Sequence, residues 1–129
     1  MDLNNRIQQV LAQHGGIRMA ILFGSLAKAQ ATPQSDLDLA IQMDAPLTAE
    51  AKMALIGELS QAIGRPVDLI DLRVAGEPIL GQILKHGARL LGSDSDHAEL
   101  LKRHLFEEAD FMPYRRRILA ERRQAWIGK

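Results

Sequence analysis

The stretch LFGSLAKAQATPQSDLDLAI, residues 22–41, contains the pattern that decides the fold of this chain. An apolar run ends in Gly24 and Ser25, ten residues follow, and Asp36 and Asp38 flank the leucine that opens a second apolar run. Residues two apart on a strand point to the same face, so we expect the two carboxylates side by side. Two carboxylates at such a short distance repel each other unless a cation lies between them. A turn containing glycine and serine can bind a phosphate through its backbone N–H groups and the serine hydroxyl. The stretch therefore predicts a metal site beside a phosphate-binding turn, suited to metal-assisted chemistry on a nucleotide.

The rest of the chain predicts helices and strands that alternate around this stretch. Helical spacing and capping residues predict helices over residues 3–14, 48–63 and 78–87, and apolar runs predict strands over residues 17–23, 37–43, 67–72 and 88–91. Residues 92–96 (GSDSD) indicate a polar linker. From His97 the chain is predicted to be helical to about Trp126, with an interruption near Pro113. This order predicts an α+β fold, a small mixed β-sheet covered by helices, with a C-terminal helical tail.

The order of elements also selects a third carboxylate. For Ser25 to meet Asp36, the first two strands must run antiparallel, whereas the helix between the second and third strands predicts a parallel pair. The starts of the second and third strands then share one edge of the sheet, and Asp68 is second in its strand. Asp71 points to the opposite face and lies about 10 Å further along, at about 3.3 Å per residue. We therefore expect Asp68, rather than Asp71, to join the aspartate pair.

Each of these residues also has a purely structural interpretation. The aspartate pair could mark a solvated junction between turn and strand, and Asp68 could form an ion pair with Arg65 or Arg73. Gly24 could serve only the turn. For Lys28, binding of a triphosphate and simple solvation agree equally well with the sequence. The spacing between the GS and DLD segments favours the functional interpretation for the carboxylates.

Composition and charge narrow the class of protein. The 129 residues are 47% apolar and 25% charged, which is typical of one soluble globular domain. The absence of cysteine excludes disulfides, thiolate zinc sites and a catalytic cysteine. No signal-peptide pattern and no apolar run of membrane length is present, so we expect a cytoplasmic protein. Residues 1–96 carry 8 basic and 11 acidic side chains and residues 97–129 carry 8 and 5, so the basic excess is confined to the tail. This distribution favours a protein partner at least as much as nucleic acid, and we expect no direct nucleic-acid binding.

The Gly-Ser pair, the ten-residue spacing and the Asp-x-Asp motif together resemble the signature of the polymerase-β-like nucleotidyltransferases. At this length the chain is similar to the minimal nucleotidyltransferases (MNT), which act as antitoxins to HEPN-domain toxins. The motif covers residues 24–38, and a looser likeness extends through PVDLIDLR (residues 66–73) and GQILKHGARLLG (residues 81–92). A lone Asp-x-Asp is weak, but the Gly-Ser pair at this spacing makes the resemblance much more specific.

The resemblance implies a Mg²⁺-dependent nucleotidyltransferase that moves AMP from ATP to a tyrosine hydroxyl of a HEPN ribonuclease toxin and so neutralises it. The implied metal-binding and catalytic residues are Asp36, Asp38 and Asp68. The implied nucleotide-binding residues are Gly24, Ser25 and Lys28. The family often has an arginine after the Gly-Ser pair and a glycine four residues after the serine, where this chain has Leu26 and Ala29. Because of this departure, the sequence does not identify the residue that makes one of the family's phosphate contacts.

Residues 97–129 are expected to form a C-terminal helical segment beside a nucleotidyltransferase domain of residues 1–96. The segment has many large apolar groups, namely Phe106, Phe111, Tyr114, Ile118 and Trp126, flanked by Arg115, Arg116, Arg117, Arg122 and Arg123. It could pack on its own domain, but aromatic and arginine anchors favour docking of the toxin. Two other functions stay open: an antitoxin that only blocks its toxin sterically, and a small-molecule or RNA nucleotidyltransferase that has lost, or borrows, a substrate domain.

Overall fold

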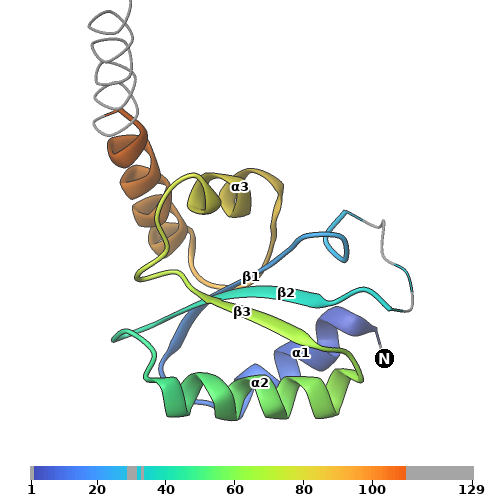
Figure 1. Cartoon of the computed structure of the whole chain (residues 1–129). Coiled ribbons are helices and arrows are strands. Elements are labelled where there is room, and N and C mark those ends of the chain that lie inside the picture. The colour runs from blue at the N-terminus through green and yellow to red at the C-terminus, as the bar shows by residue number, and fades with distance from the viewer. Residues whose placement is uncertain (1, 29–31, 33, 110–129) are drawn as a thin grey trace, which may run out of the picture.

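The computed structural model describes residues 2–28, 32 and 34–109 (Figure 1). The elements follow in the order α1 (Leu3–Ala12), β1 (Ile17–Phe23), β2 (Leu37–Met43), α2 (Ala49–Ile63), β3 (Val67–Asp71), α3 (Ile79–His86) and β4 (Ala88–Leu91). Residues 94–109 form a further helix, which we call the 94–109 helix. Within the described part of the chain, no helix combines the length and apolarity needed to cross a membrane.

The strands form one 4-stranded sheet in the order β3-β2-β1-β4. β1 runs antiparallel to both β2 and β4, whereas β2 and β3 are parallel. α2 is the crossover that a parallel pair requires. The mixed sheet and the predicted α+β fold are therefore confirmed, including the antiparallel and parallel pairings that led to the choice of Asp68.

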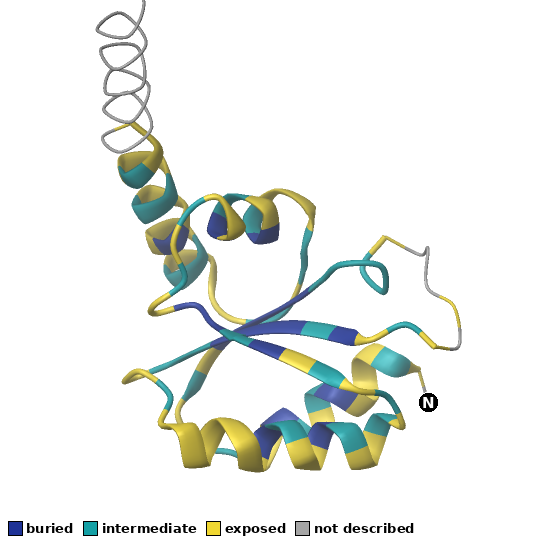
Figure 2. Ribbon diagram, viewed as in Figure 1, coloured by how far each residue is buried: buried dark blue, intermediate teal, exposed yellow. Residues whose placement is uncertain are grey.

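Helices cover both faces of the sheet, as Figure 1 shows. Buried side chains of α1 and α2 pack against one face, and they are Ile7, Leu11, Leu55 and Leu59. α3 and the 94–109 helix cover the other face through Leu80, Ile83 and Leu100. Figure 2 shows that the buried residues of α2 face the sheet while its outer side is exposed. Because Leu37 and Leu39 face α1 and α2, strand alternation turns Asp38 toward the face covered by α3.

Capping groups explain where the first two helices begin and end. Asp2 Oδ1 accepts a hydrogen bond from Asn5 N (2.8 Å) at the start of α1, and Thr48 Oγ1 accepts one from Ala51 N (3.1 Å) at the start of α2. Gly64 ends α2 in the left-handed region, with φ of 75°. The predicted caps Asp2, Thr48 and Gly64 are confirmed, but α1 ends at Ala12 with Gln13 as its C-cap, two residues earlier than predicted and before the glycine pair Gly15 and Gly16 that was expected to end it.

The predicted polar linker over residues 92–96 is wrong in its second part, because the last helix begins at residue 94. Ser93 provides the N-cap: its hydroxyl accepts from Asp96 N (3.0 Å) and its carbonyl oxygen from His97 N (3.0 Å). β3 is also one residue shorter than predicted and ends at Asp71. The predicted continuation of the helix to Trp126 lies outside the described residues.

Candidate active site

The starts of β2 and β3 bring carboxylates together at one edge of the sheet, on the right in Figure 1. Asp38 is aligned with Asp68 in the parallel register, and Phe23 at the end of β1 is aligned with Asp38. Asp36 lies one residue before β2. The predicted placement of Asp68 beside the aspartate pair is therefore confirmed. We call Asp36, Asp38 and Asp68 the carboxylate edge.

The electrostatics of Asp38 show that the members of the carboxylate edge interact. Partial burial raises the pKa of the Asp38 carboxyl, and the nearby charges of Asp68 and then Asp36 raise it further. Both causes disfavour a negative charge at Asp38. A cation bound among these oxygens would remove the repulsion, so the edge is suited to an ion that the chain itself does not supply.

Gly24 brings the turn after β1 directly against Asp38. Its φ of 73° lies in the left-handed region, and a Cβ at this position would be 2.2 Å from Asp38 Oδ2. Both facts require a glycine here. The next residue, Ser25, is partly buried, and its carbonyl oxygen accepts from Lys28 N (3.2 Å), while the Lys28 side chain is exposed. Leu26, at the place where the family often has an arginine, packs against the apolar cluster of α1 and α2.

The carboxylate oxygens of the carboxylate edge are the kind of ligand that Mg²⁺ prefers. Within residues 2–28, 32 and 34–109, no three histidine or carboxylate side chains already surround one point at ligand spacing. Mg²⁺ prefers oxygen ligands and is usually held by one or two carboxylates together with waters and substrate phosphates, rather than by a closed protein cage. Asp36, Asp38 and Asp68 offer such oxygens beside the turn at Gly24.

The two arginines that could have neutralised Asp68 are occupied elsewhere. Arg65 Nη1 donates to backbone carbonyl oxygens in the segment before β2, and Arg73 donates to those of Met43 (2.7 Å) and Asp44 (2.6 Å) at the other end of β2. Among the ion pairs between described residues, none includes a member of the carboxylate edge. The sequence did not indicate these arginine–carbonyl contacts, because its only signal was an arginine on either side of β3.

Asp71 has a different environment from Asp68, although both belong to β3. It is 8% exposed, and its carboxylate accepts from Leu47 N (2.8 Å) and Arg73 N (3.0 Å). It is aligned with Ile41, at the opposite end of β2 from the carboxylate edge. Asp71 therefore stabilises the chain around the far end of the sheet.

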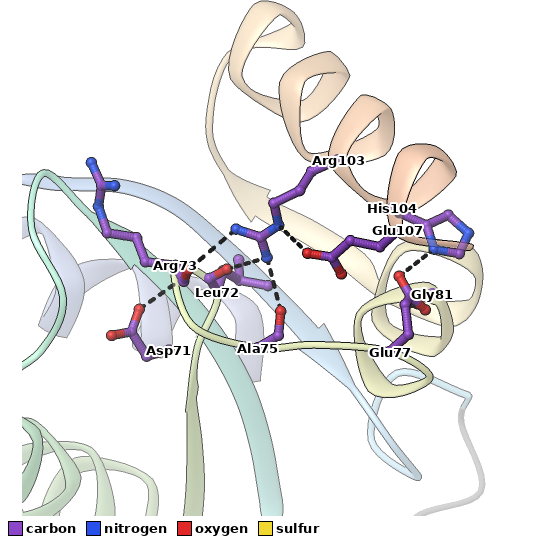
Figure 3. A network of polar contacts seen from close by, with 9 residues as sticks. All are labelled: Asp71, Leu72, Arg73, Ala75, Glu77, Gly81, Arg103, His104 and Glu107. Carbon is purple, nitrogen blue, oxygen red and sulfur yellow. Dashed lines mark hydrogen bonds and ion pairs between the residues drawn. The ribbon is translucent and has the colours of Figure 1, made fainter. Parts of the chain in front are cut away.

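At that far end, the 94–109 helix is fixed to the loop after β3 (Figure 3). The Arg103 guanidinium donates to the carbonyl oxygens of Leu72 (2.5 Å) and Ala75 (3.1 Å). Next to it, His104 Nδ1 lies 2.6 Å from Glu77 Oε1. Two adjacent residues of the helix thus hold the loop between β3 and α3.

The solvent-exposed part of the 94–109 helix carries three large apolar side chains among charged ones. Leu101, Leu105 and Phe106 are 41%, 57% and 58% exposed. A hollow of about 370 Å³ lies between this helix and β2, and Gln42, Arg103 and Phe106 contribute to its lining. The other predicted docking residues, from Phe111 to Trp126, lie outside the described residues.

Comparison with known proteins adds a family and several relatives. Residues 5–96 match the family described as "Polymerase beta, Nucleotidyltransferase". Over 80 residues the chain is 31% identical to the protein adenylyltransferase MntA of Shewanella oneidensis, an alignment that covers 62% of this chain and 58% of MntA. The chain therefore matches less than two thirds of the length of this relative.

Solved structures give the same result for the fold. A crystal structure of a toxin–antitoxin with AMP-PNP is similar with a TM-score of 0.84 and 25% identity, covering 93% of this chain and 98% of that one. A minimal nucleotidyltransferase structure is similar with a TM-score of 0.55 and 27% identity, covering 66% of this chain and 86% of the other.

Proposed function

Because the chain belongs to the polymerase beta nucleotidyltransferase family, we propose that it is an antitoxin that transfers AMP from ATP to its toxin. The acceptor is a tyrosine hydroxyl on a HEPN ribonuclease, and the modification neutralises that ribonuclease in the cytoplasm. The name of the relative MntA, a protein adenylyltransferase, supports the reaction, and the similar toxin–antitoxin structure with AMP-PNP supports the nucleotide and the kind of partner.

The observation that carries the proposal is the carboxylate edge. Asp38 and Asp68 are aligned on neighbouring strands, Asp36 precedes them, and Gly24 lies against Asp38. The pKa of Asp38 is raised by burial and by the other two charges, which is unfavourable for a merely structural cluster. Such an arrangement is expected where a substrate-bound cation completes the charge balance.

The proposed reaction is an in-line displacement at phosphorus. The acceptor oxygen attacks the α-phosphorus of ATP, the bond from that phosphorus to the pyrophosphate oxygen breaks, and pyrophosphate leaves. Asp68 accepts the proton of the attacking hydroxyl. Gly24, Ser25 and Lys28 hold the outer phosphates so that the leaving group is aligned. Mg²⁺ held by the carboxylate edge would neutralise part of the negative charge of the triphosphate.

The 94–109 helix is the proposed start of the docking surface, and residues 97–129 are the proposed docking segment beside a catalytic domain of residues 1–96. Leu101, Leu105 and Phe106 offer the apolar area that an interface needs at its centre. The hollow beside them supports the same proposal.

The direct test is the intact mass of a purified HEPN partner after incubation with this protein, ATP and Mg²⁺. We expect the partner's mass to increase by one or more AMP groups, only when both ATP and the divalent ion are present. A partner that is bound but never modified would contradict the proposed transfer.

A steric antitoxin is the second candidate, because the exposed side of the 94–109 helix does not include the carboxylate edge and docking there requires no chemistry. Growth rescue by Asp68→Asn distinguishes the two functions. An inactive variant that still protects cells fully from the toxin favours steric blocking, whereas loss of protection favours modification.

A further inference from the structure

Thr32 and Ser35, which precede the carboxylate edge, are joined in a turn by two hydrogen bonds. Thr32 N donates to Ser35 Oγ (2.8 Å), and Ser35 N donates back to the Thr32 carbonyl oxygen (3.0 Å). Arg65, in the connection between α2 and β3, reaches this turn. Its Nη1 donates to the carbonyl oxygens of Thr32 (2.9 Å) and Ser35 (2.9 Å). One guanidinium nitrogen therefore holds both ends of the turn.

The residue after Arg65 contacts the chain on the other side of Asp36. Leu37 N donates to the Pro66 carbonyl oxygen (2.8 Å), and this contact begins the alignment of β2 with β3. Arg65 and Pro66 thus bind the residues immediately before and after Asp36, while the Asp36 side chain itself stays exposed. The backbone of Asp36 is fixed on both sides and its carboxylate remains available.

We propose that Arg65 is a positioning residue for the candidate active site. It fixes the backbone of Asp36, and through the start of β2 that of Asp38, so that their carboxylates face Asp68. This inference rests on the proposed role of Asp36 and Asp38 and deepens it. Because Arg65 uses Nη1 on carbonyl oxygens, it orders an acidic site without forming an ion pair with the carboxylates.

Arginine suits this position better than lysine. A guanidinium has five N–H donors in a fixed plane and is less strongly hydrated than an ammonium, so it can hold carbonyl oxygens in a partly buried place. A lysine at this position retains the charge and can donate to one carbonyl oxygen or the other, but its flexible chain fixes the turn less well. Arg65→Lys is therefore expected to restore part of the positioning.

The chain contains a matched control for a purely structural role. Arg73 donates to the carbonyl oxygens of Met43, the last residue of the same strand, and of Asp44, the residue after it. Each of the two arginines therefore binds a pair of backbone carbonyls at one end of β2: Arg65 binds two before its start, and Arg73 binds those of its last residue and of the residue after it. Only the pair bound by Arg65 lies next to the carboxylate edge.

The experiment compares the full-length variants Arg65→Ala, Arg65→Lys and Arg73→Ala with wild type. Five quantities are measured: Tm, amide hydrogen exchange at residues 35–38, Mn²⁺ affinity, and the kcat and the KM of AMP transfer. The Tm of both alanine variants is expected to fall by a similar amount relative to wild type. Arg65→Ala alone should lose exchange protection at residues 35–38, bind Mn²⁺ more weakly and transfer AMP about 10²-fold more slowly, the loss that a misplacement of about 1 Å can cause.

Arg65→Lys should recover part of each loss, and Arg73→Ala should transfer AMP close to the wild-type rate. Equal losses of transfer in the two alanine variants, or unchanged exchange and Mn²⁺ affinity in Arg65→Ala, would overturn the positioning role. If wild type transfers no AMP, the proposed function fails, and the exchange and Mn²⁺ measurements still decide the role of Arg65.

Discussion

Asp71 lies at the end of β3 and accepts hydrogen bonds from Leu47 N and Arg73 N. Asp68 lies at the start of the same strand and is exposed, and its charge raises the pKa of Asp38. The same contrast holds for the chain around them. Beyond the end of β3, Arg103 binds backbone carbonyls and His104 pairs with Glu77. At the start of β2 and β3, the carboxylates face one another.

This contrast separates what stabilises the molecule from what remains for a ligand. Buried charges are costly unless they are paired or hydrogen-bonded, and the far end of the sheet follows this rule. The carboxylate edge differs, because its three like charges have no ion-pair partner among the described residues, and Arg65 and Pro66 hold Asp36 through contacts to backbone atoms on either side of it. Such local departures are expected at functional sites.

Removing the charge of the aspartate pair should have the largest effect. The double variant Asp36→Asn, Asp38→Asn keeps the size of the side chains but removes the charge that attracts a cation, so AMP transfer should fall to background while the protein stays folded. Asp44→Asn, Asp94→Asn is a matched control, because it removes two charges from exposed ion pairs with Arg18 and Arg89. Transfer assays and thermal melts compare the two, and undiminished transfer in the first variant would rule out the site.

Asp68 and Asp71 should respond in opposite ways to the same substitution. Asp68→Asn should reduce transfer by about 10²–10⁴-fold, as expected for loss of a positioned proton acceptor, with partner binding retained. Asp71→Asn should transfer at nearly the wild-type rate but lose about 1–3 kcal/mol of stability, because one buried amide loses its acceptor. Steady-state kinetics and denaturant unfolding measure the two effects. An inactive Asp71→Asn with active Asp68→Asn would reverse the assignment.

Two glycines with nearly the same φ test how closely the turn must approach Asp38. Gly24 and Gly64 have φ of 73° and 75°, but a Cβ at Gly24 would meet the Asp38 carboxylate and one at Gly64 would meet nothing within 4 Å. Gly64→Ala should cost about 1–2 kcal/mol of stability from the left-handed conformation alone, and transfer should be kept. Gly24→Ala should cost more and reduce transfer by about 10²-fold through displacement of Asp38. If the two alanine variants lost the same stability and transferred AMP at the same rate, the close approach of Gly24 to Asp38 would be unimportant.

The exposed side of the 94–109 helix should affect binding and leave the nucleotide site unchanged. Leu105→Ser, Phe106→Ser should weaken toxin binding by about 2 kcal/mol, or about 30-fold in Kd, if these side chains anchor the interface. Met53→Ser on α2 is the control, because Met53 is also an exposed apolar residue, at 68%. Calorimetry with toxin and with ATP separates the two sites. The docking proposal fails if the helix variant binds toxin as wild type does.

The smallest effect should come from the charge of Asp38 in the absence of divalent ions. The folded-state pKa of Asp38 is raised above its ordinary value of 3.8, so protonation favours the folded state. The stability that follows is present below the unfolded pKa and is lost as pH rises through the folded pKa. Asp38→Asn, which is always neutral, should therefore have a slightly higher Tm than wild type at neutral pH, and the difference should vanish below the ordinary value. A lower Tm of Asp38→Asn than of wild type at neutral pH would contradict the repulsion between Asp38 and the other two carboxylates.

Local patterns were sufficient to predict the strands and the pairing that brings Asp68 to Asp38. The apolar runs of β1 and β2 have clear breakers at their ends, and the requirement that Ser25 meets Asp36 fixed the antiparallel pair. The contacts of Arg65 and Arg103 could not be predicted, because long side chains have many rotamers and their acceptors are backbone atoms about 30 residues away. Ser93 is a residue type that commonly caps a helix, but the polar composition of GSDSD is equally typical of a linker, so the sequence alone does not distinguish the two.

The most direct measurement is an NMR titration of the full-length protein with Mn²⁺ and a non-hydrolysable ATP analogue. The paramagnetic ion broadens the amide signals of residues close to where it binds. We predict that the signals of Gly24, Asp38 and Asp68 broaden at the lowest Mn²⁺ concentrations, that those of Asp71 and Arg103 at the far end broaden only at higher ones, and that Asp36→Asn, Asp38→Asn removes the effect. Broadening that begins around Asp71 and Arg103, or that persists unchanged in the double variant, would contradict the assignment of the carboxylate edge as the metal-nucleotide site.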